Sequence, residues 1–111
     1  MDGVTVKILT HEDDAQISPS ERGILIEMPS ERAETGTKYV AFVVKSLDAL
    51  SETYIKNAAY GLAAFECPYS EGDWSDIPEA DVLAWRAQER QLEAEYVAII
   101  ETKLMEALAR A

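Results

Sequence analysis

The sequence predicts an α+β fold, in which an N-terminal β-hairpin or three-stranded antiparallel meander packs on two long antiparallel helices. Apolar and polar residues alternate before residue 30, which is the period of half-buried strands. Beyond residue 46 the apolar residues recur every three or four positions, which is the period of an amphipathic helix. Pro68 divides this helical part in two, because a proline disfavours helical backbone at the residue before it. The 111 residues suffice for one ordinary hydrophobic core, so we expect 1–111 to form a single domain.

Two strands are expected near the N-terminus, over about 3–10 and 23–28. Their inward-facing residues are all apolar: Val4, Val6 and Ile8 in the first strand, and Ile24, Ile26 and Met28 in the second. Pro29 ends the second strand. A long polar loop joins the two, so we expect them to pair in antiparallel fashion.

Residues 38–45 fit two different structures. Their β-branched and aromatic side chains favour a third strand. Apolar residues also recur at helical spacing from this point onward, at Val40, Val43, Leu47, Leu50 and Tyr54. We expect a third strand over about 38–45, followed by a helix that Ser46 caps. The alternative is a single helix over about 38–66, capped by Thr37.

The first helix is expected over about 46–66. Its predicted apolar face consists of Leu47, Leu50, Tyr54, Ala58, Leu62 and Phe65. Small residues over 57–64 would let another backbone come close. Gly61 costs a helix about 1 kcal/mol relative to alanine, so we expect another element to pack closely against it.

The second helix is expected over about 77–110, since nothing in this range breaks the pattern. Asp76 and Glu79 have the spacing of a capping box at its start. The interspersed charges of this helix, such as those of Arg86 and Glu89, indicate a mixed-charge face in solvent.

Apolar residues of the second helix form two stripes. The first consists of Trp85, Leu92, Tyr96 and Ile99, and the second of Val97, Ile100, Leu104 and Leu108. One neighbouring helix would leave part of this surface uncovered. Because burial of each Leu or Ile side chain contributes about 1.5–3 kcal/mol, a second copy that covered this surface would be stabilised. We therefore predict a homodimer or larger oligomer that is joined through the second stripe.

The net charge of −11 is spread evenly, with −5 over residues 1–55 and −6 over residues 56–111. Such a charge repels nucleic acid and anionic membranes and favours basic protein surfaces, so we expect neither nucleic-acid nor membrane binding. The single cysteine, Cys67, excludes an internal disulfide and a cysteine zinc cluster. No signal-peptide pattern opens the sequence and no apolar run reaches the roughly 18–20 residues of a membrane span, so we expect a cytoplasmic protein.

Catalytic chemistry has little support in the sequence. The only histidine, His11, stands beside three carboxylates in "HEDD", but consecutive loop residues point in different directions and no second histidine is present. No nucleophile motif or glycine-rich phosphate loop accompanies it. We expect a solvated acidic loop, no metal, no cofactor and no enzyme activity. An enzyme that uses His11 or a pair of carboxylates is the alternative.

The segment between the two helices combines acids with large rings. Residues 66–81 hold six carboxylates and no Lys or Arg, together with Tyr69 and Trp74. In one interpretation the rings fold back to close the helical hairpin. In the other they are the centre of a partner-binding surface, ringed by the carboxylates Glu71, Asp73 and Asp76.

These features predict a small acidic cytosolic interaction protein, which acts stoichiometrically by binding a basic protein. Inhibitors, immunity proteins, antitoxins and anti-defence proteins are often of this kind. The alternative is a self-associating assembly factor or chaperone, for example a phage-type assembly accessory protein.

Overall fold

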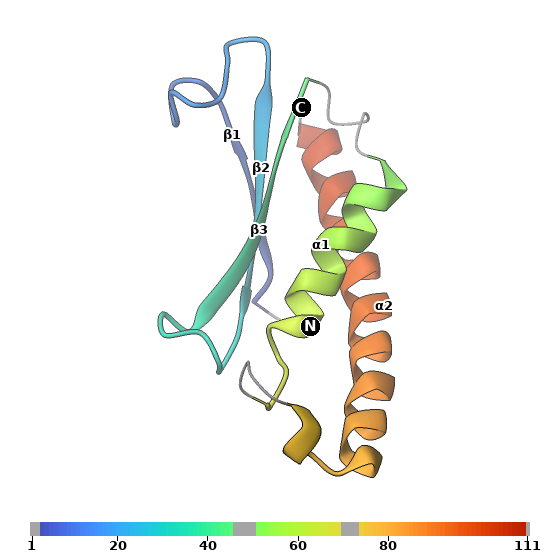
Figure 1. The fold of residues 1–111 in the computed structure, drawn as a ribbon. Helices are drawn as coiled ribbons and strands as arrows, with labels where there is room; N and C mark the ends of the chain where they lie inside the picture. The colour runs from blue at the N-terminus through green and yellow to red at the C-terminus, as the bar shows by residue number, and fades with distance from the viewer. Residues whose placement is uncertain (1–2, 46–50, 70–73, 111) are drawn as a thin grey trace.

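The computed structural model describes residues 3–45, 51–69 and 74–110, with the side chains of residues 108 and 110 excepted. A three-stranded antiparallel sheet is followed by two helices, the second of them long (Figure 1). The molecule is elongated, with extents of 50 × 24 × 24 Å. The predicted α+β fold, with a strand meander before a helical pair, is confirmed.

The sheet contains β1 (Thr5–Leu9), β2 (Arg22–Pro29) and β3 (Thr37–Val44) in that spatial order. Ile26 at its centre pairs with Val6 on one side and Val40 on the other. The third strand is therefore confirmed, and the alternative of one helix over 38–66 is wrong. In β3 the exposure of side chains alternates from residue to residue, which is the period of a strand with one covered face.

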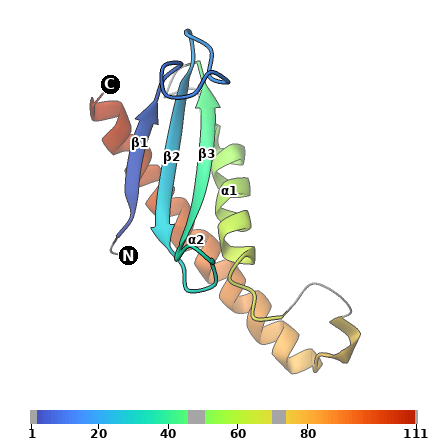
Figure 2. The same cartoon turned by 90° about the vertical axis from the view of Figure 1, so that its left-hand side faces the viewer.

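The hydrophobic core lies on one face of this sheet. Val6, Ile24, Ile26 and Met28 point into it and are buried, as their alternation predicts. The helices α1 (Glu52–Ala64) and α2 (Glu79–Arg110) cover this face, while Figure 2 looks onto the opposite face of the sheet. Helix α2 contacts β1 and β2, and α1 contacts β3.

Helix α1 buries a different face from the one that the sequence indicated. Ser51 caps it, because the Ser51 hydroxyl accepts a hydrogen bond from the backbone N–H of Tyr54 at 3.3 Å. Its buried residues are Ile55, Ala59, Leu62 and Ala63. Of the predicted face only Leu62 is among them, while Tyr54 is 64% exposed and Phe65 is 46% exposed. The two buried alanines belong to the core cluster, and their small side chains permit the close packing of α1, whose contacts are mainly with α2. The predicted cap Ser46, with Leu47 and Leu50, lies outside the described residues.

Gly61 does not have the close neighbour that we expected. A Cβ placed on this residue would meet no atom within 4 Å among the described residues. The expectation of tight packing at Gly61 is therefore wrong within the described part of the chain.

Helix α2 begins two residues later than predicted. Asp76 belongs to a 3₁₀ helix, η2 (Trp74–Asp76), and the carbonyl of Pro78 accepts hydrogen bonds from the N–H groups of Asp81 and Val82. Glu79 is thus the first helical residue, and the predicted capping box of Asp76 and Glu79 is wrong. Figure 2 shows that the first half of α2 extends beyond the sheet and carries η2 at its far end.

The second stripe of α2 faces the core. Ile100 and Leu104 are buried in the same cluster as the sheet residues, and Val97 packs against that cluster while partly buried. The side chain of Leu108 lies outside the described residues. The sheet and α1 thus cover the described part of the predicted dimer seam, namely Val97, Ile100 and Leu104. The reason for placing an oligomer contact there is removed, whereas the oligomeric state itself stays a prediction.

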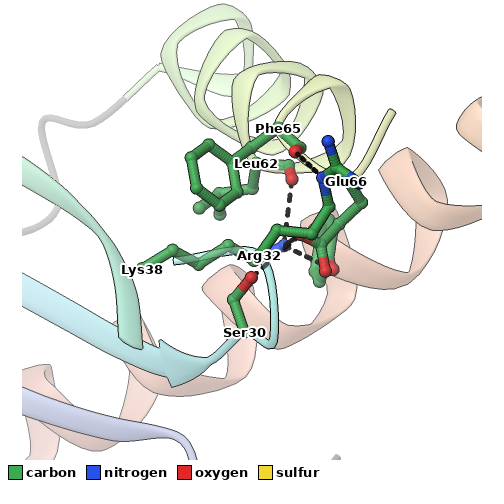
Figure 3. A network of polar contacts seen from close by, with 7 residues as sticks. Ser30, Arg32, Lys38, Leu62, Phe65 and Glu66 are labelled. Atoms are coloured by element: carbon green, nitrogen blue, oxygen red, sulfur yellow. Dashed lines mark hydrogen bonds and ion pairs between the residues drawn. The ribbon is translucent and has the colours of Figure 1, made fainter. Parts of the chain in front are cut away.

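A buried lysine joins β3 to both helices (Figure 3). The Lys38 ammonium donates to the carbonyl of Leu62 at 3.0 Å and to the Tyr96 hydroxyl at 2.8 Å. It also lies 3.6 Å from Oε2 of Glu66, which accepts a hydrogen bond from the Ser30 hydroxyl at 2.9 Å.

A second cation, the Arg32 guanidinium, reaches the end of the same helix. Its Nε donates to the carbonyl of Phe65 at 3.2 Å (Figure 3). Cations thus satisfy two carbonyls near the end of α1, where the helix cannot satisfy them itself. Together with Lys38, this contact fixes the end of α1 against the β2–β3 loop.

Candidate functional site

The candidate site lies at the hinge between α1 and α2. Helix α1 ends at Ala64, and the N–H groups of Glu66 and Cys67 bond back to the carbonyls of Ala63 and Ala64. Pro68 then prevents the helix from continuing. The chain turns toward η2 and enters α2, so this end of the molecule gathers residues from four separate segments.

The two rings that the sequence singled out contact each other. Tyr69 and Trp74 form an edge-to-face pair, with ring centroids 5.5 Å apart and an interplanar angle of 69°. The guanidinium of Arg86, one element further on, lies 5.1 Å from the centroid of the Trp74 ring. An aromatic pair of this geometry contributes about 0.5–1.5 kcal/mol beyond the area that it buries. Both residues remain partly exposed, so the pair does not disappear into the core.

These rings form part of the wall of a cavity of about 410 Å³, which we call the hinge cleft. Its lining residues come from the β2–β3 loop, α1, the hinge and α2: Arg32, Tyr60, Ala64, Cys67, Tyr69, Trp74, Trp85, Arg86 and Glu89. Cavities that bind small ligands or anchor side chains measure about 300–1,000 Å³ and are lined mainly by apolar and aromatic groups. The hinge cleft has this size, but polar groups make up nearly half of its wall, among them Arg32, Arg86 and Glu89.

Trp85, which also lines the hinge cleft, carries an unused hydrogen-bond donor. Its side chain is only 4% exposed, and its indole N–H has no hydrogen-bond partner among the described residues. A buried donor without an acceptor costs about 1–3 kcal/mol. The N–H has almost no exposed surface, so this donor belongs to the buried part of Trp85 and not to the open cleft.

An ion pair between exposed Arg86 and buried Glu89 forms another part of the same wall. Glu89 is buried, and its carboxylate accepts a hydrogen bond of 3.0 Å from the guanidinium of Arg86. This hydrogen bond and the charge of Glu89 raise the pKa of Arg86, and Tyr60 acts in the same direction to a smaller extent. Glu89 itself departs from the expectation of a solvated mixed-charge face, whereas Arg86, Arg90 and Glu95 of the same helix are exposed as expected. The pair leaves the cleft wall without a free negative charge among its described residues.

The structure brings together only part of the predicted partner-binding surface. Tyr69 and Trp74 line the hinge cleft, and Asp76 is exposed in the same 3₁₀ turn as Trp74. Glu71 and Asp73 lie outside the described residues.

Sequence inspection assigned two of the nine lining residues to a site, Tyr69 and Trp74, and missed the other seven: Arg32, Tyr60, Ala64, Cys67, Trp85, Arg86 and Glu89. For Glu89 a signal was present, because it stands four residues after Trp85 and three before Leu92, on the first apolar stripe of α2. Arg32 comes from a loop that is distant in sequence, and no local pattern marks it.

His11, on which the catalytic alternative depended, lies in the β1–β2 loop. Its Nδ1 donates to the carbonyl of Ile17 at 2.6 Å and so holds that loop together. Within residues 3–45, 51–69 and 74–110, no three His, Cys, Asp or Glu side chains are placed to hold a metal ion. No helix in the described part of the chain combines the length and the apolar character that crossing a membrane requires.

No protein-family model, curated protein or solved structure matches this chain. A function can therefore be proposed only from the side chains of the described residues, and those of the hinge cleft form the candidate site. They offer four aromatic side chains and two guanidinium groups. This set suits an inserted apolar or aromatic side chain.

Proposed function

We propose that this chain is a small cytosolic interaction protein, which binds a basic protein partner stoichiometrically through the hinge cleft, as an inhibitor, immunity protein, antitoxin or anti-defence protein does. The observation that carries the proposal is the hinge cleft itself, with the partly exposed Tyr69–Trp74 pair in its wall. Tryptophan and tyrosine in a concave site are the residues that most often dominate binding energy.

The charges around the hinge cleft determine how such a partner would be oriented. Arg32 and Arg86 in the wall would repel a lysine or arginine that entered the cleft. Exposed carboxylates of the adjoining turns, at Asp76, Glu79 and Asp81, would instead attract basic groups to the rim. The partner therefore inserts an apolar or aromatic side chain and keeps its basic residues outside the cleft. Charges at a rim act mainly on the rate of association and on orientation.

Affinity capture with the purified protein tests this proposal. The wild type, Trp74→Ala and the control Met105→Ala are immobilised and exposed to the lysate, and a protein that only the wild type and the control retain is purified. Met105 is a suitable control because it is exposed on α2, in the half of the helix that lies away from the hinge. With the purified partner we expect Trp74→Ala to weaken binding about 30- to 1,000-fold, mainly through faster dissociation.

A variant at the rim of the hinge cleft tests whether the carboxylates act on the association rate, in contrast to Trp74, which should act on the dissociation rate. Asp76→Asn should slow association modestly, and added salt should abolish the difference because screening acts over about 8 Å at physiological ionic strength. If Trp74→Ala lowers the melting temperature but leaves affinity unchanged, the rings serve only to close the helical hairpin. That result would refute the hinge cleft as the binding site.

A further inference from the structure

A second surface, separate from the hinge cleft, lies along the open edge of the sheet. Strand β3 pairs with β2 alone among the described residues, so its outer backbone groups have no strand partner there. It is eight residues long and contains no proline. Natural sheets usually blunt such an edge, because it invites pairing with another chain.

An apolar groove of about 430 Å³ runs beside this edge, between β3 and α1. We call it the β3–α1 groove; its lining residues are Thr37, Lys38, Tyr39, Val40, Ala58, Gly61, Leu62 and Phe65. Ala58, Leu62 and Phe65 belong to the apolar stripe that the sequence predicts for this helix, and of these only Leu62 is buried. The groove is therefore the part of that stripe which the described chain does not cover.

Gly61 leaves unfilled space within the β3–α1 groove. A glycine inside a helix costs about 1 kcal/mol relative to alanine, and this glycine has open space where a side chain would stand. No described residue uses that space. Absence of a Cβ there lets another backbone approach α1 closely.

The arrangement of α1 and β3 indicates which kind of segment could pair with the open edge of β3. Figure 2 shows α1 emerging beside β3 at the open edge of the sheet. A strand added to β3 would lie over this helix and point alternate side chains into the β3–α1 groove. A second copy that paired through its own β3 would bring its own α1 toward the same space. A segment without an attached helix fits the edge better.

Charge favours a basic segment. The molecule carries −11, and Glu31 and Glu34 are exposed in the loop that leads into β3. The two lysines of the stretch 35–47 are Lys38, which is buried beside Glu66, and Lys45, which is exposed just after β3, so attraction for a basic segment comes from the acids outside the strand. The surrounding acids would attract lysine or arginine on the flanks.

We propose that the β3–α1 groove binds an extended segment of a partner protein, which adds to β3 as a fourth strand. Small apolar residues of the segment fill the groove above Gly61, and basic residues flank them. This surface is distinct from the hinge cleft and does not depend on the function proposed for it.

A synthetic peptide tests the proposal directly. The probe is a fluorescent peptide of alternating valine and threonine with two lysines at each end, and fluorescence anisotropy measures its binding. Two control peptides carry a central proline, which cannot pair as a strand, or glutamates in place of the lysines. We expect each control to bind at least about tenfold more weakly than the probe.

Two protein variants locate the site. Gly61→Leu fills the groove, and it should weaken probe binding at least about tenfold while the melting temperature stays the same or rises, because leucine has the higher helix propensity. Lys56→Leu adds the same side chain at an exposed position of α1 outside the groove, and it should leave binding unchanged. Retained binding by Gly61→Leu, equal binding of the proline peptide, or no binding by the wild type would each overturn the proposal. A wild-type dimer in sedimentation that Gly61→Leu converts to monomer would also overturn it, because the occupant would then be a second copy.

Discussion

Lys38 occupies an inward-facing position of β3, where the side chain of a strand in contact with the helices must enter the core. Its side chain is 5% exposed, and Leu62, Tyr96 and Glu66 surround its ammonium group. The alternation of β3 places Lys38 on the same face as Val40, so its burial follows from the pattern once the strand is accepted. The buried ammonium is tolerated because the Leu62 carbonyl, the Tyr96 hydroxyl and the Glu66 carboxylate all lie close to it.

Replacing Lys38 by methionine keeps the apolar stem and removes the ammonium. We expect a loss of about 1–3 kcal/mol in the free energy of unfolding, since the buried acceptors then lack a donor. Glu66 is 24% exposed and can turn to water, which holds the loss below that of breaking a fully buried pair. Urea denaturation measures the difference.

Lys7→Met provides the matched control for Lys38→Met. The Lys7 ammonium lies 3.9 Å from Glu27, but its side chain is exposed on β1. Exposed pairs of this kind contribute about 0–1 kcal/mol. If both variants lose the same amount, the contacts of Lys38 contribute no more than a surface pair does.

Trp85 offers a second test at the scale of one side chain. Trp85→Phe removes the unpaired N–H but keeps an aromatic ring, so the lost packing and the relieved donor offset each other, and we expect a change below about 1 kcal/mol in the free energy of unfolding. Trp85→Ala should cost about 3–5 kcal/mol, as truncation of buried aromatics does. Thermal unfolding compares the two. A loss for Trp85→Phe as large as that for Trp85→Ala would show that the indole N–H is satisfied in the folded protein.

Glu21 supplies a pH-dependent part of the stability. Hydrogen bonds from the hydroxyl and backbone N–H of Ser18 lower the pKa of Glu21 below 4.5, and the charge of Lys45 adds to this effect. A lowered pKa means that the folded state stabilises the ionised form, so the contribution is present above the ordinary pKa and disappears as pH falls through the lowered one. Glu21→Gln should therefore be less stable than the wild type at about pH 7, and the gap should close in acid. Melting temperatures of the wild type and Glu21→Gln across this pH range test the prediction. A difference in melting temperature that did not change with pH would contradict the lowered pKa of Glu21.

At the scale of elements, the strands were predictable and the orientation of α1 was not. In β1 and β2 the alternation of apolar residues alone identifies the buried face, because a strand has only two faces. Helix α1 carries apolar or small residues around most of its surface, so sequence spacing does not decide which stripe faces the core. Packing decided it, since Ala59 and Ala63 allow the closest approach to α2. Of the hinge cleft only Tyr69 and Trp74 were predictable, while its arginines come from elements that only the fold brings near.

The close approach of α1 to α2 can be tested by enlarging one alanine. Ala59→Leu should cost about 1–3 kcal/mol in the free energy of unfolding, because the added atoms have no room between the helices. Asn57→Leu adds the same side chain at an exposed position of α1 and should stay within about 0.5 kcal/mol of the wild type. Equal effects in chemical denaturation would mean that the alanines do not set the helix spacing.

For the whole molecule, the evenly distributed negative charge should make the stability of the fold depend on salt concentration. A net charge of −11 repels itself in the folded state, and salt screens this repulsion. The melting temperature should therefore rise between about 10 mM and 150 mM NaCl, while affinity for a basic partner falls over the same range. Calorimetry and binding measurements in the same buffers check the opposite trends. A melting temperature that falls with salt would mean that ion pairs outweigh the repulsion.

The reach of α2 beyond the sheet divides the molecule into two levels of local stability. Residues of α2 from Leu92 onward pack against the sheet, whereas the earlier turns contribute no side chain to that core among the described residues. Segments with few core contacts open locally without global unfolding. Amide protons in the first turns of α2 would then exchange through such an opening, and those from Leu92 onward only when the whole domain unfolds. A molecule bound in the hinge cleft would join α1, η2 and these turns, and it would slow exchange there without changing that of the sheet.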